Sequence, residues 1–467
     1  MKKFIVALNI VIISLIACKN PTPYTGTAKK LTERNLSITK NNSYSDLFLD
    51  SLTVEAFIAE QKLSDTVAND MRSFYNSRNF QFAWFASDGL TEQAYAFNSL
   101  YDYTEDSARK VLDRKMDNLM IEENLIPSAS DADIVKTELS LTWRFINYSW
   151  SKYPEADARA SVLEGSVPAQ KKLTLQAADE VLANSNANAA NPSYDLLRAQ
   201  LKKYADSIKT LPDTGMGRML KDSLSLKIQH ILVNMERMKW MPAEPKGELI
   251  IVNIPEFRLY VRNGNTEEFN MDVVVGKQGH NTVMFTGELN QVVFSPYWNL
   301  PPSIIKKEIL PEMEKNSNYL QEKNMEVTGE ENGLPVVRQL PGEHNDLGKV
   351  KFLFPNSFNI YFHDTPYKEL FNKDKRAYSH GCIRLSDPVK MAQHLLKNQS
   401  EWTPQRIDSA MNSGEEKYVK VENPVRVMIS YYTAWVDKNG TLMTAEDIYN
   451  HDAKLARKMF TDPKQKG

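Results

Sequence analysis

The sequence is poor in cysteine, since its 467 residues contain only Cys18 and Cys382. It also lacks the Cys/His spacings that hold zinc and the glycine-rich loops that cradle phosphates. These absences argue against a zinc site and against a phosphate-binding loop.

No excess of charge of either sign is present. The chain has 57 Lys and Arg residues against 59 Asp and Glu, a formal net charge of -2 at pH 7. Bulk binding to nucleic acid needs a basic excess to neutralise phosphates, so the charge balance argues against that class of partner. The length and the ordinary globular composition predict two or three domains.

The N-terminal apolar run, Phe4 to Ile16, is too short to span a bilayer as a helix. Lys2 and Lys3 precede it, which is the profile of a signal peptide over residues 1–18. The run ends in Leu-Ile-Ala-Cys, which resembles the lipobox of bacterial lipoproteins, so we expect Cys18 to carry a lipid. The alternative is a plain secretory signal with an incidental cysteine.

Residues 19–44 are rich in Asn, Ser, Thr, Lys and Pro and have few large apolar side chains. Such a segment buries too little apolar surface to offset its conformational entropy. The composition therefore predicts a flexible tether.

If Cys18 carries a lipid, Cys382 is the one thiol of an exported protein and has no internal partner. A lone thiol in that compartment is either an inert, buried small hydrophobe or a working nucleophile. The residues around Cys382 must decide between these two interpretations.

The pattern of apolar residues over 45–241 predicts a helical domain. Apolar and aromatic residues recur there at helical spacing, as in Val67, Met71 and Phe74. Longer stripes of this kind run through Leu139, Trp143, Ile146, Trp150 and Tyr153, and through Leu197, Leu201, Tyr204 and Ile208. We interpret them as core positions.

From Gly247 the period changes to two, which is the period of half-buried strands. The Asn263-Gly264 pair, set between two alternating runs, predicts a tight hairpin. Residues 242–435 thus form a mostly β domain, with an insertion at about 301–348 that carries one helix, Ile304–Lys315, and predicts a lid. Residues 436–467 are predicted to be a polar tail, and the fold class is α+β.

Two segments of the β domain carry groups suited to nucleophilic catalysis. One is the strand ending Tyr361-Phe362-His363-Asp364, in which alternation puts Tyr361 and His363 on one face. The other is Ser379-His380-Gly381-Cys382-Ile383-Arg384. If it is extended, His380, Cys382 and Arg384 share a face, so spacing alone allows either His363 or His380 to serve as the base.

These residue types fit acyl transfer through a thiol. Cysteine attacks as the thiolate, and a nearby imidazole both takes the proton and stabilises the anion. Gly381 lets backbone amides approach a developing oxyanion, and Arg384 presents a fork of donors suited to a carboxylate. Of the other histidines, we interpret the following as structural or exposed: His230, His280, His344, His394 and His451.

The segments His363-Asp364-Thr365-Pro366 and Ser379 to Arg384 closely resemble the signature of L,D-transpeptidase (YkuD-type) catalytic domains. The resemblance continues through residues 297–303, 338–342 and 432–437 to the large, scaffold-bearing subfamily, and through residues 74–85 to its helical scaffold. That subfamily usually inserts a peptidoglycan-binding domain before the catalytic domain. Here too little chain separates Tyr204 from the helix at Leu224, so we predict that this domain is missing.

The resemblance implies a role for each matched residue. Cys382 is the expected nucleophile and His363 the general base, oriented by backbone near Asp364. The amides around Gly381 and Cys382 form the expected oxyanion hole, supported by Ser379 and His380. The expected substrate-binding residues are Tyr361 and Arg384 in the cleft and Trp298 on the lid.

The resemblance also implies a substrate. A tetrapeptide stem of peptidoglycan acylates the cysteine and releases D-Ala, and the amine of a second stem completes a 3→3 link without a metal or an organic cofactor. Water or a protein amine as acceptor, giving a carboxypeptidase, an endopeptidase or an anchoring enzyme, stays open. So does a non-catalytic peptidoglycan-binding scaffold. The expected place is the cell envelope, facing the periplasm from a lipid anchor in the outer membrane.

Overall fold

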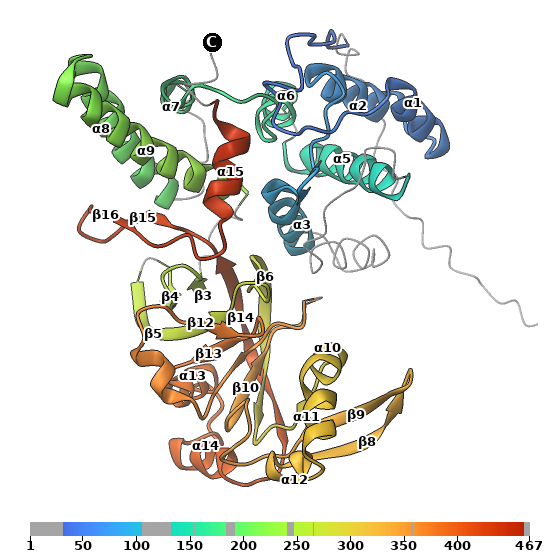
Figure 1. The fold of residues 1–467 in the computed structure, drawn as a ribbon, viewed down its shortest axis with the longest axis vertical. Coiled ribbons are helices and arrows are strands. Elements are labelled where there is room, and N and C mark those ends of the chain that lie inside the picture. Colours follow the sequence, from blue (N-terminus) through green and yellow to red (C-terminus); the bar gives the residue numbers. More distant parts are fainter. Residues whose placement is uncertain are drawn as a thin grey trace, which may run out of the picture.

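The structure is a computed structural model. It describes residues 31–104, 132–153, 155–183, 192–240, 247–264, 266–356 and 358–461. The predicted signal peptide and Cys18 lie outside these residues. Within the described part of the chain, the helices are too short or too polar to cross a membrane. Most of the long helices lie at one end of the molecule, and the strands lie at the other end together with several short helices (Figure 1).

The predicted helical domain is confirmed, and it forms two lobes with separate cores (Figure 1). The first lobe contains α1 (Ser51–Glu60), α2 (Asp65–Ser77), the short strands β1 (Phe85–Ala86) and β2 (Gly89–Leu90), α3 (Glu92–Thr104), α5 (Ala132–Lys152) and α6 (Ala156–Gly165). The second lobe contains α7 (Thr174–Ala183), α8 (Pro192–Thr210) and α9 (Gly215–Met238). Residues 211–214 alone join α8 to α9, which leaves no room there for an inserted domain, as predicted.

The first lobe is organised around one buried carboxylate, Glu138 on α5. Its two oxygens accept hydrogen bonds from the backbone amides of Ala83 (2.7 Å) and Trp84 (2.9 Å), and the Tyr75 hydroxyl donates a third. Burial raises the pKa of Glu138 to about 7, against the opposing effect of those donors and of Arg78. Glu138 therefore ties the 83–84 turn to α2 and α5.

Residues 31–44 differ from the tether prediction, because they pack on the scaffold. Ile38 and Tyr44 are 1% and 2% exposed, and the Tyr44 hydroxyl donates to Gln93 at 2.6 Å. The Asn35 amide donates to the carbonyl of Asn76 at 2.9 Å. A low average hydrophobicity concealed these few strong anchors.

In the β domain, nine of the described strands form one sheet in the order β12-β5-β13-β11-β10-β6-β14-β3-β4, and β4 also pairs with β5, so that the strands curl around one core. Their bounds are β3 (Glu248–Asn253), β4 (Arg258–Asn263), β5 (Thr266–Gly276), β6 (Phe285–Phe294), β10 (Val350–Leu353), β11 (Phe362–His363), β12 (Ala377–Ser379), β13 (Ile383–Leu385) and β14 (Lys417–Ser430). Helices α13 (Pro388–Leu395) and α14 (Pro404–Met411) pack beside it. The predicted hairpin joins β4 to β5, and Gly264 has a φ of 55°.

The lid, defined here as residues 298–339, has its own small core (Figure 1). Where one helix was predicted, the chain forms α10 (Pro302–Ile304), the π-helical turn η1 (Ile305–Ile309), α11 (Leu310–Lys315) and α12 (Tyr319–Glu322). Pro311 has no N–H, and the Leu310 amide before it bonds the carbonyl of Ile305, which widens the turn. The strands β7 (Trp298–Asn299), β9 (Leu334–Gln339) and β8 (Met325–Glu331) complete the lid as a small sheet in that order.

The C-terminal segment is folded, where a polar tail was predicted. It forms β15 (Ala434–Val436), β16 (Leu442–Thr444) and α15 (His451–Met459), which lies between the two scaffold lobes (Figure 1). Leu455 is buried in the core of the second lobe, and Lys458 pairs with Asp88 of the first at 2.6 Å. Its polar residues were misleading because they pair with the scaffold.

We expect Glu138→Gln to lower the free energy of unfolding by about 1–3 kcal/mol, because an amide nitrogen cannot accept from a buried backbone N–H. The measurement is chemical denaturation followed by tryptophan fluorescence. The control, Glu60→Gln, removes an exposed pair with Lys136 and should change stability by well under about 1 kcal/mol. Equal effects of the two substitutions would contradict the role of Glu138.

Candidate active site

The sheet brings the two predicted segments together as neighbouring strands. β11 and β13 run parallel, with Phe362 opposite Ile383 and His363 opposite Arg384. The Ile383 amide donates to the carbonyl of Tyr361 at 3.1 Å. Because side chains alternate along a strand, Phe362 and Ile383 enter the core, and His363 and Arg384 share the opposite face.

His363 is 4% exposed, and the position of one ring nitrogen fixes its tautomer. Its Nδ1 is hydrogen-bonded to the backbone carbonyl of Asp364, which can only accept. Nδ1 must therefore carry the proton, and Nε2 is left as a base. Burial, helped by the nearby Arg384 cation, lowers the pKa of His363 to about 3, so the ring is neutral at pH 7.

Asp364 holds the turn that follows His363. Its carboxylate accepts from the backbone amides of Thr365 (2.7 Å) and Lys349 (2.9 Å) and from the Lys368 ammonium (2.6 Å). Gly348 has a φ of 61°, and a Cβ there would lie 2.4 Å from this carboxylate. A glycine is thus required at 348 for the carboxylate to fit.

Cys382 is partly exposed, so it is not sealed in apolar packing. Its thiol donates to the carbonyl of Asn359, with 3.6 Å between sulfur and oxygen, and hydrogen-bonds the Tyr361 hydroxyl. Burial of the sulfur raises the pKa of Cys382 to about 11, against the opposing effect of Tyr361 and Arg384. The resting site consequently holds a neutral thiol and a neutral imidazole.

The loop before Cys382 is braced from within and from a neighbouring turn. The Ser379 hydroxyl donates to the carbonyl of Cys382 (2.5 Å) and accepts from the Gly381 amide (3.1 Å). The Thr282 hydroxyl donates to the carbonyl of Gly381 at 2.7 Å. Gly381 has a φ of 116°, a conformation that side chains disfavour, so the loop needs glycine there.

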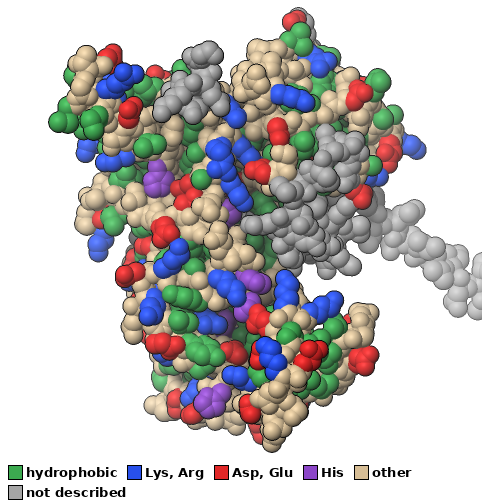
Figure 2. All heavy atoms as spheres, viewed as in Figure 1, with side chains coloured by type: hydrophobic (Ala, Val, Ile, Leu, Met, Phe, Trp, Pro, Cys, Tyr) green, Lys and Arg blue, Asp and Glu red, His purple; other side chains and the backbone are tan. Residues whose placement is uncertain are grey.

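His380 does not share the face of Cys382 and Arg384 as an extended segment would require. The positive φ of Gly381 interrupts the alternation, and His380 contacts Glu308 of the lid turn η1 at 2.7 Å. Its ring also packs edge-on against His280, with 5.0 Å between centroids. On the face shown in Figure 2, histidine, lysine and arginine side chains gather beside the lid.

Arg384 is half-buried and presents an unused donor. Its guanidinium lies over the ring of Tyr367, 5.4 Å from the centroid, and faces the carboxylate of Asp346. Its Nε is buried and has no hydrogen-bond partner in the described structure. Burial lowers the pKa of Arg384, and a bound anion would relieve that cost.

Trp298 lies on β7, where it pairs with Gln339 of β9 and packs against the core of the lid. Trp298 thus belongs to the lid as defined above, and its part in substrate binding stays a prediction. Tyr361 lies beside His363, with 5.8 Å between ring centroids, as the alternation predicted.

Three residues near the far edge of the sheet have metal-ligating atoms within 4.8 Å of one another, namely Glu248, Glu268 and His394. The Lys397 ammonium contacts Glu248, so the chain itself supplies a positive charge beside these carboxylates. Another histidine taken as structural, His230, pairs with Asp452 at 3.2 Å.

Three residues at the site carried little signal in the sequence. Thr282 follows an ordinary turn, Glu308 is one of many acidic lid residues, and Asn359 contributes only its backbone carbonyl. Asn359 has a φ of 54°, which asparagine tolerates better than most residues. The identity of Asn359 is the one hint that a search for turns would have found.

Comparison with known families identifies two domains. Residues 247–427 match the L,D-transpeptidase catalytic domain family, YkuD, and residues 69–205 match the family described as Scaffold domain. The first match contains every residue of the predicted site apart from the lipidation cysteine. The second begins within α2 and ends within α8, so it covers most of the first lobe and leaves out α9 of the second.

A Haemophilus influenzae protein named "Putative L,D-transpeptidase" is 32% identical over 244 residues, which are 49% of this chain and 49% of that protein. This chain thus spans about half the length of the curated relative it matches. Among solved structures, an L,D-transpeptidase from Mycobacterium smegmatis aligns at 14% identity over 39% of this chain and 58% of its own, with a TM-score of 0.21. Mycobacterium tuberculosis L,D-transpeptidase 1 aligns at 13% identity over 39% of this chain and 62% of its own, with a TM-score of 0.19.

The raised pKa of the thiol predicts how its alkylation depends on pH. We expect the rate of Cys382 labelling by iodoacetamide to keep rising above pH 9, with a midpoint near 11, because only the thiolate reacts. Peptide mass spectrometry separates this label from any on Cys18. A rate that is already constant between pH 6 and 8 would indicate a preformed thiolate–imidazolium pair and contradict the prediction.

Proposed function

We propose that this chain, which carries an L,D-transpeptidase catalytic domain behind a scaffold domain, is a peptidoglycan L,D-transpeptidase with Cys382 as its nucleophile. The observation that carries the proposal is the register of β11 and β13. That register sets His363 and Arg384 side by side on the face next to the partly exposed Cys382.

In the first half-reaction, the sulfur of Cys382 attacks the carbonyl of the third residue of a tetrapeptide stem. The thiol proton passes to Nε2 of His363, a C–S bond forms, and the C–N bond to the terminal D-Ala breaks. His363 then gives the proton to the leaving amine of D-Ala. Because thiol and ring start neutral, the proton moves during the attack rather than before it.

The negative charge that develops on the oxygen of the attacked carbonyl needs a hydrogen-bond donor. The Gly381 amide is already bonded to the Ser379 hydroxyl, so we assign this role to the amide of Cys382 itself. Ser379 keeps the loop closed around that amide. The sequence led us to expect that the amides of Gly381 and Cys382 act together, whereas this assignment gives the role to the Cys382 amide alone.

Arg384 supplies recognition of the donor. Its buried, unpartnered Nε and the facing ring of Tyr367 suit a carboxylate of the stem, as on D-Ala or on the side chain of diaminopimelate. The Asp346 carboxylate partly balances the positive charge of Arg384. An anionic ligand would therefore bind a guanidinium whose charge is already partly compensated.

In the second half-reaction, the amine of another stem attacks the thioester. The C–N bond forms, the C–S bond breaks, and the amine proton returns through His363 to the thiolate. The product is a 3→3 cross-link. Water in place of the amine would release a tripeptide instead, and a protein amine would anchor that protein.

We expect the form lacking residues 1–18 to convert a disaccharide-tetrapeptide into a dimer that has lost one D-Ala, as measured by mass spectrometry. His363→Gln should slow this about 10²-fold or more, because proton transfer in the transition state is lost. The matched control, His380→Gln, removes the contacts with Glu308 of the lid and with the ring of His280, and it should stay within about 10-fold of wild type.

Each other outcome has a distinct meaning. A tripeptide without dimer makes the enzyme a carboxypeptidase, and no product at all favours a non-catalytic scaffold. Full activity of His363→Gln with loss in His380→Gln would overturn the assignment of the base.

We also propose that Cys18 is lipidated and holds the protein at the outer membrane, with the catalytic domain in the periplasm. When the full-length protein is made in a Gram-negative host, the N-terminal peptide should begin at a diacylglyceryl cysteine in mass spectra. Cys18→Ser should release the protein into the soluble periplasmic fraction. Membrane retention of that variant would contradict the anchor.

A further inference from the structure

A buried tyrosine of the C-terminal segment contacts the turn formed by residues 276–282. The segment Ser379–Gly381, which precedes Cys382 and is called the nucleophile loop below, rests on this turn. Tyr449 is 3% exposed. Its hydroxyl donates to the carbonyl of Gly276 at 2.6 Å and accepts from the Thr282 amide at 3.3 Å. The two ends of the 276–282 turn are thus held by one phenol.

The same turn holds the nucleophile loop through Thr282. The Thr282 hydroxyl accepts from the Gly276 amide at 2.9 Å and donates to the carbonyl of Gly381 at 2.7 Å. The Lys277 amide adds a hydrogen bond to the carbonyl of Ser379 at 2.9 Å. Both ends of the segment Ser379–Gly381 therefore rest on the 276–282 turn.

The turn is too tightly packed to move independently. A Cβ on Gly276 would lie 2.0 Å from the carbonyl oxygen of His280 and 2.8 Å from the Thr282 amide. A displacement at one end of the turn is consequently passed to the other end rather than absorbed.

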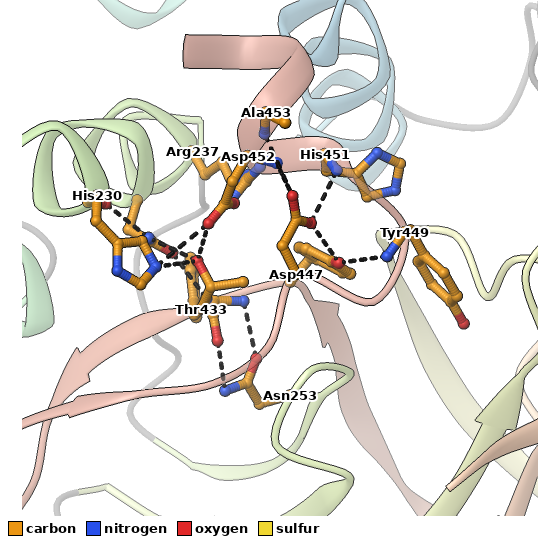
Figure 3. A network of polar contacts seen from close by, with 12 residues as sticks. His230, Arg237, Asn253, Thr433, Asp447, Tyr449, His451, Asp452 and Ala453 are labelled. Carbon is orange, nitrogen blue, oxygen red and sulfur yellow. Dashed lines mark hydrogen bonds and ion pairs between the residues drawn. The ribbon is translucent and has the colours of Figure 1, made fainter. Parts of the chain in front are cut away.

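Tyr449 is itself fixed from the side away from the loop (Figure 3). Its backbone amide donates to the hydroxyl of Tyr431 at 2.9 Å, and the two rings stack with centroids 5.6 Å apart. The Tyr431 hydroxyl in turn donates to Asp447 at 2.8 Å. The Asp447 carboxylate also accepts the amides of His451 (2.8 Å) and Asp452 (2.9 Å), which begin α15.

The helical scaffold contributes Arg237 to this network of polar contacts (Figure 3). Arg237 of α9, whose side chain is 4% exposed, pairs with Glu92 of α3 at 2.7 Å and with Asp452. Its guanidinium also lies over the ring of Tyr431, 5.3 Å from the centroid. The position of Tyr449 is therefore set by both the helical domain and the β domain.

We propose that Tyr449 is a positioning residue for the nucleophile loop, acting through Thr282 on the carbonyl of Gly381 and so on the adjoining amide and thiol of Cys382. Tyr449 touches neither substrate nor reacting atoms. This inference rests on the proposed function, in which Cys382 is acylated, and it gives the C-terminal segment and the scaffold a part in the chemistry.

The test uses the full-length protein and two substitutions that each remove one hydroxyl from the chain of contacts, Tyr449→Phe and Thr282→Val. The first readout is the second-order rate of Cys382 acylation by a carbapenem, followed by mass spectrometry. We expect each variant to be acylated roughly 10-fold more slowly, since small misplacements of reacting groups are costly. Thr282→Ser retains the hydroxyl and should recover most of the rate lost in Thr282→Val.

The matched control is Tyr75→Phe. It also removes a buried hydroxyl with two hydrogen-bond partners, Glu138 and Thr142, but within the first scaffold lobe. Its acylation rate should equal that of wild type even if its melting temperature falls as far as that of Tyr449→Phe. A merely structural role of Tyr449 predicts equal rates for these two variants, and that result would overturn the proposal.

The second readout is amide hydrogen exchange of peptides that span Ser379–Cys382, which needs no activity. Exchange should quicken in Tyr449→Phe and Thr282→Val and stay unchanged in Tyr75→Phe. If a carbapenem fails to acylate the wild-type protein, the proposed function fails, and the exchange data still decide on Tyr449. Unchanged exchange in both loop variants would refute the positioning role.

Discussion

The hydrogen bond between Nδ1 of His363 and the backbone carbonyl of Asp364 is the contact on which the site depends. The carbonyl can only accept, so the ring proton must sit on Nδ1 and the basic nitrogen must be Nε2. Burial keeps that ring uncharged. The surrounding structure preserves this one arrangement, from the carboxylate of Asp364 in the turn to Gly348, which leaves room for it.

Cys382, the proposed nucleophile, is held in a complementary way. Ser379 closes its own loop, and Thr282 and Tyr449 brace that loop from outside. The two halves of the site meet because β11 and β13 are adjacent and in register. The Cys382 thiol, which follows a loop, is thereby placed by a rigid sheet, a tight turn and a C-terminal segment that is anchored to the scaffold.

Much of this arrangement could be predicted from local patterns. Alternation put Tyr361 and His363 on one face, and the Asn-Gly pair located the hairpin. Composition was a poorer guide, because it averages over residues. Tyr44 and Tyr449 are among the few buried anchors within polar stretches that were expected to be a flexible tether and a polar tail. The expectation that an extended segment would put His380 on the face of Cys382 was wrong, because the positive φ of Gly381 interrupts the alternation and His380 contacts the lid.

The most direct test of the account is the tautomer of His363, measured by nitrogen-15 NMR on protein labelled at histidine and assigned through the loss of its signals in His363→Gln. The account predicts a proton on Nδ1, a bare Nε2 and no titration between pH 5 and 8. A proton on Nε2, or a doubly protonated ring at pH 7, would contradict it.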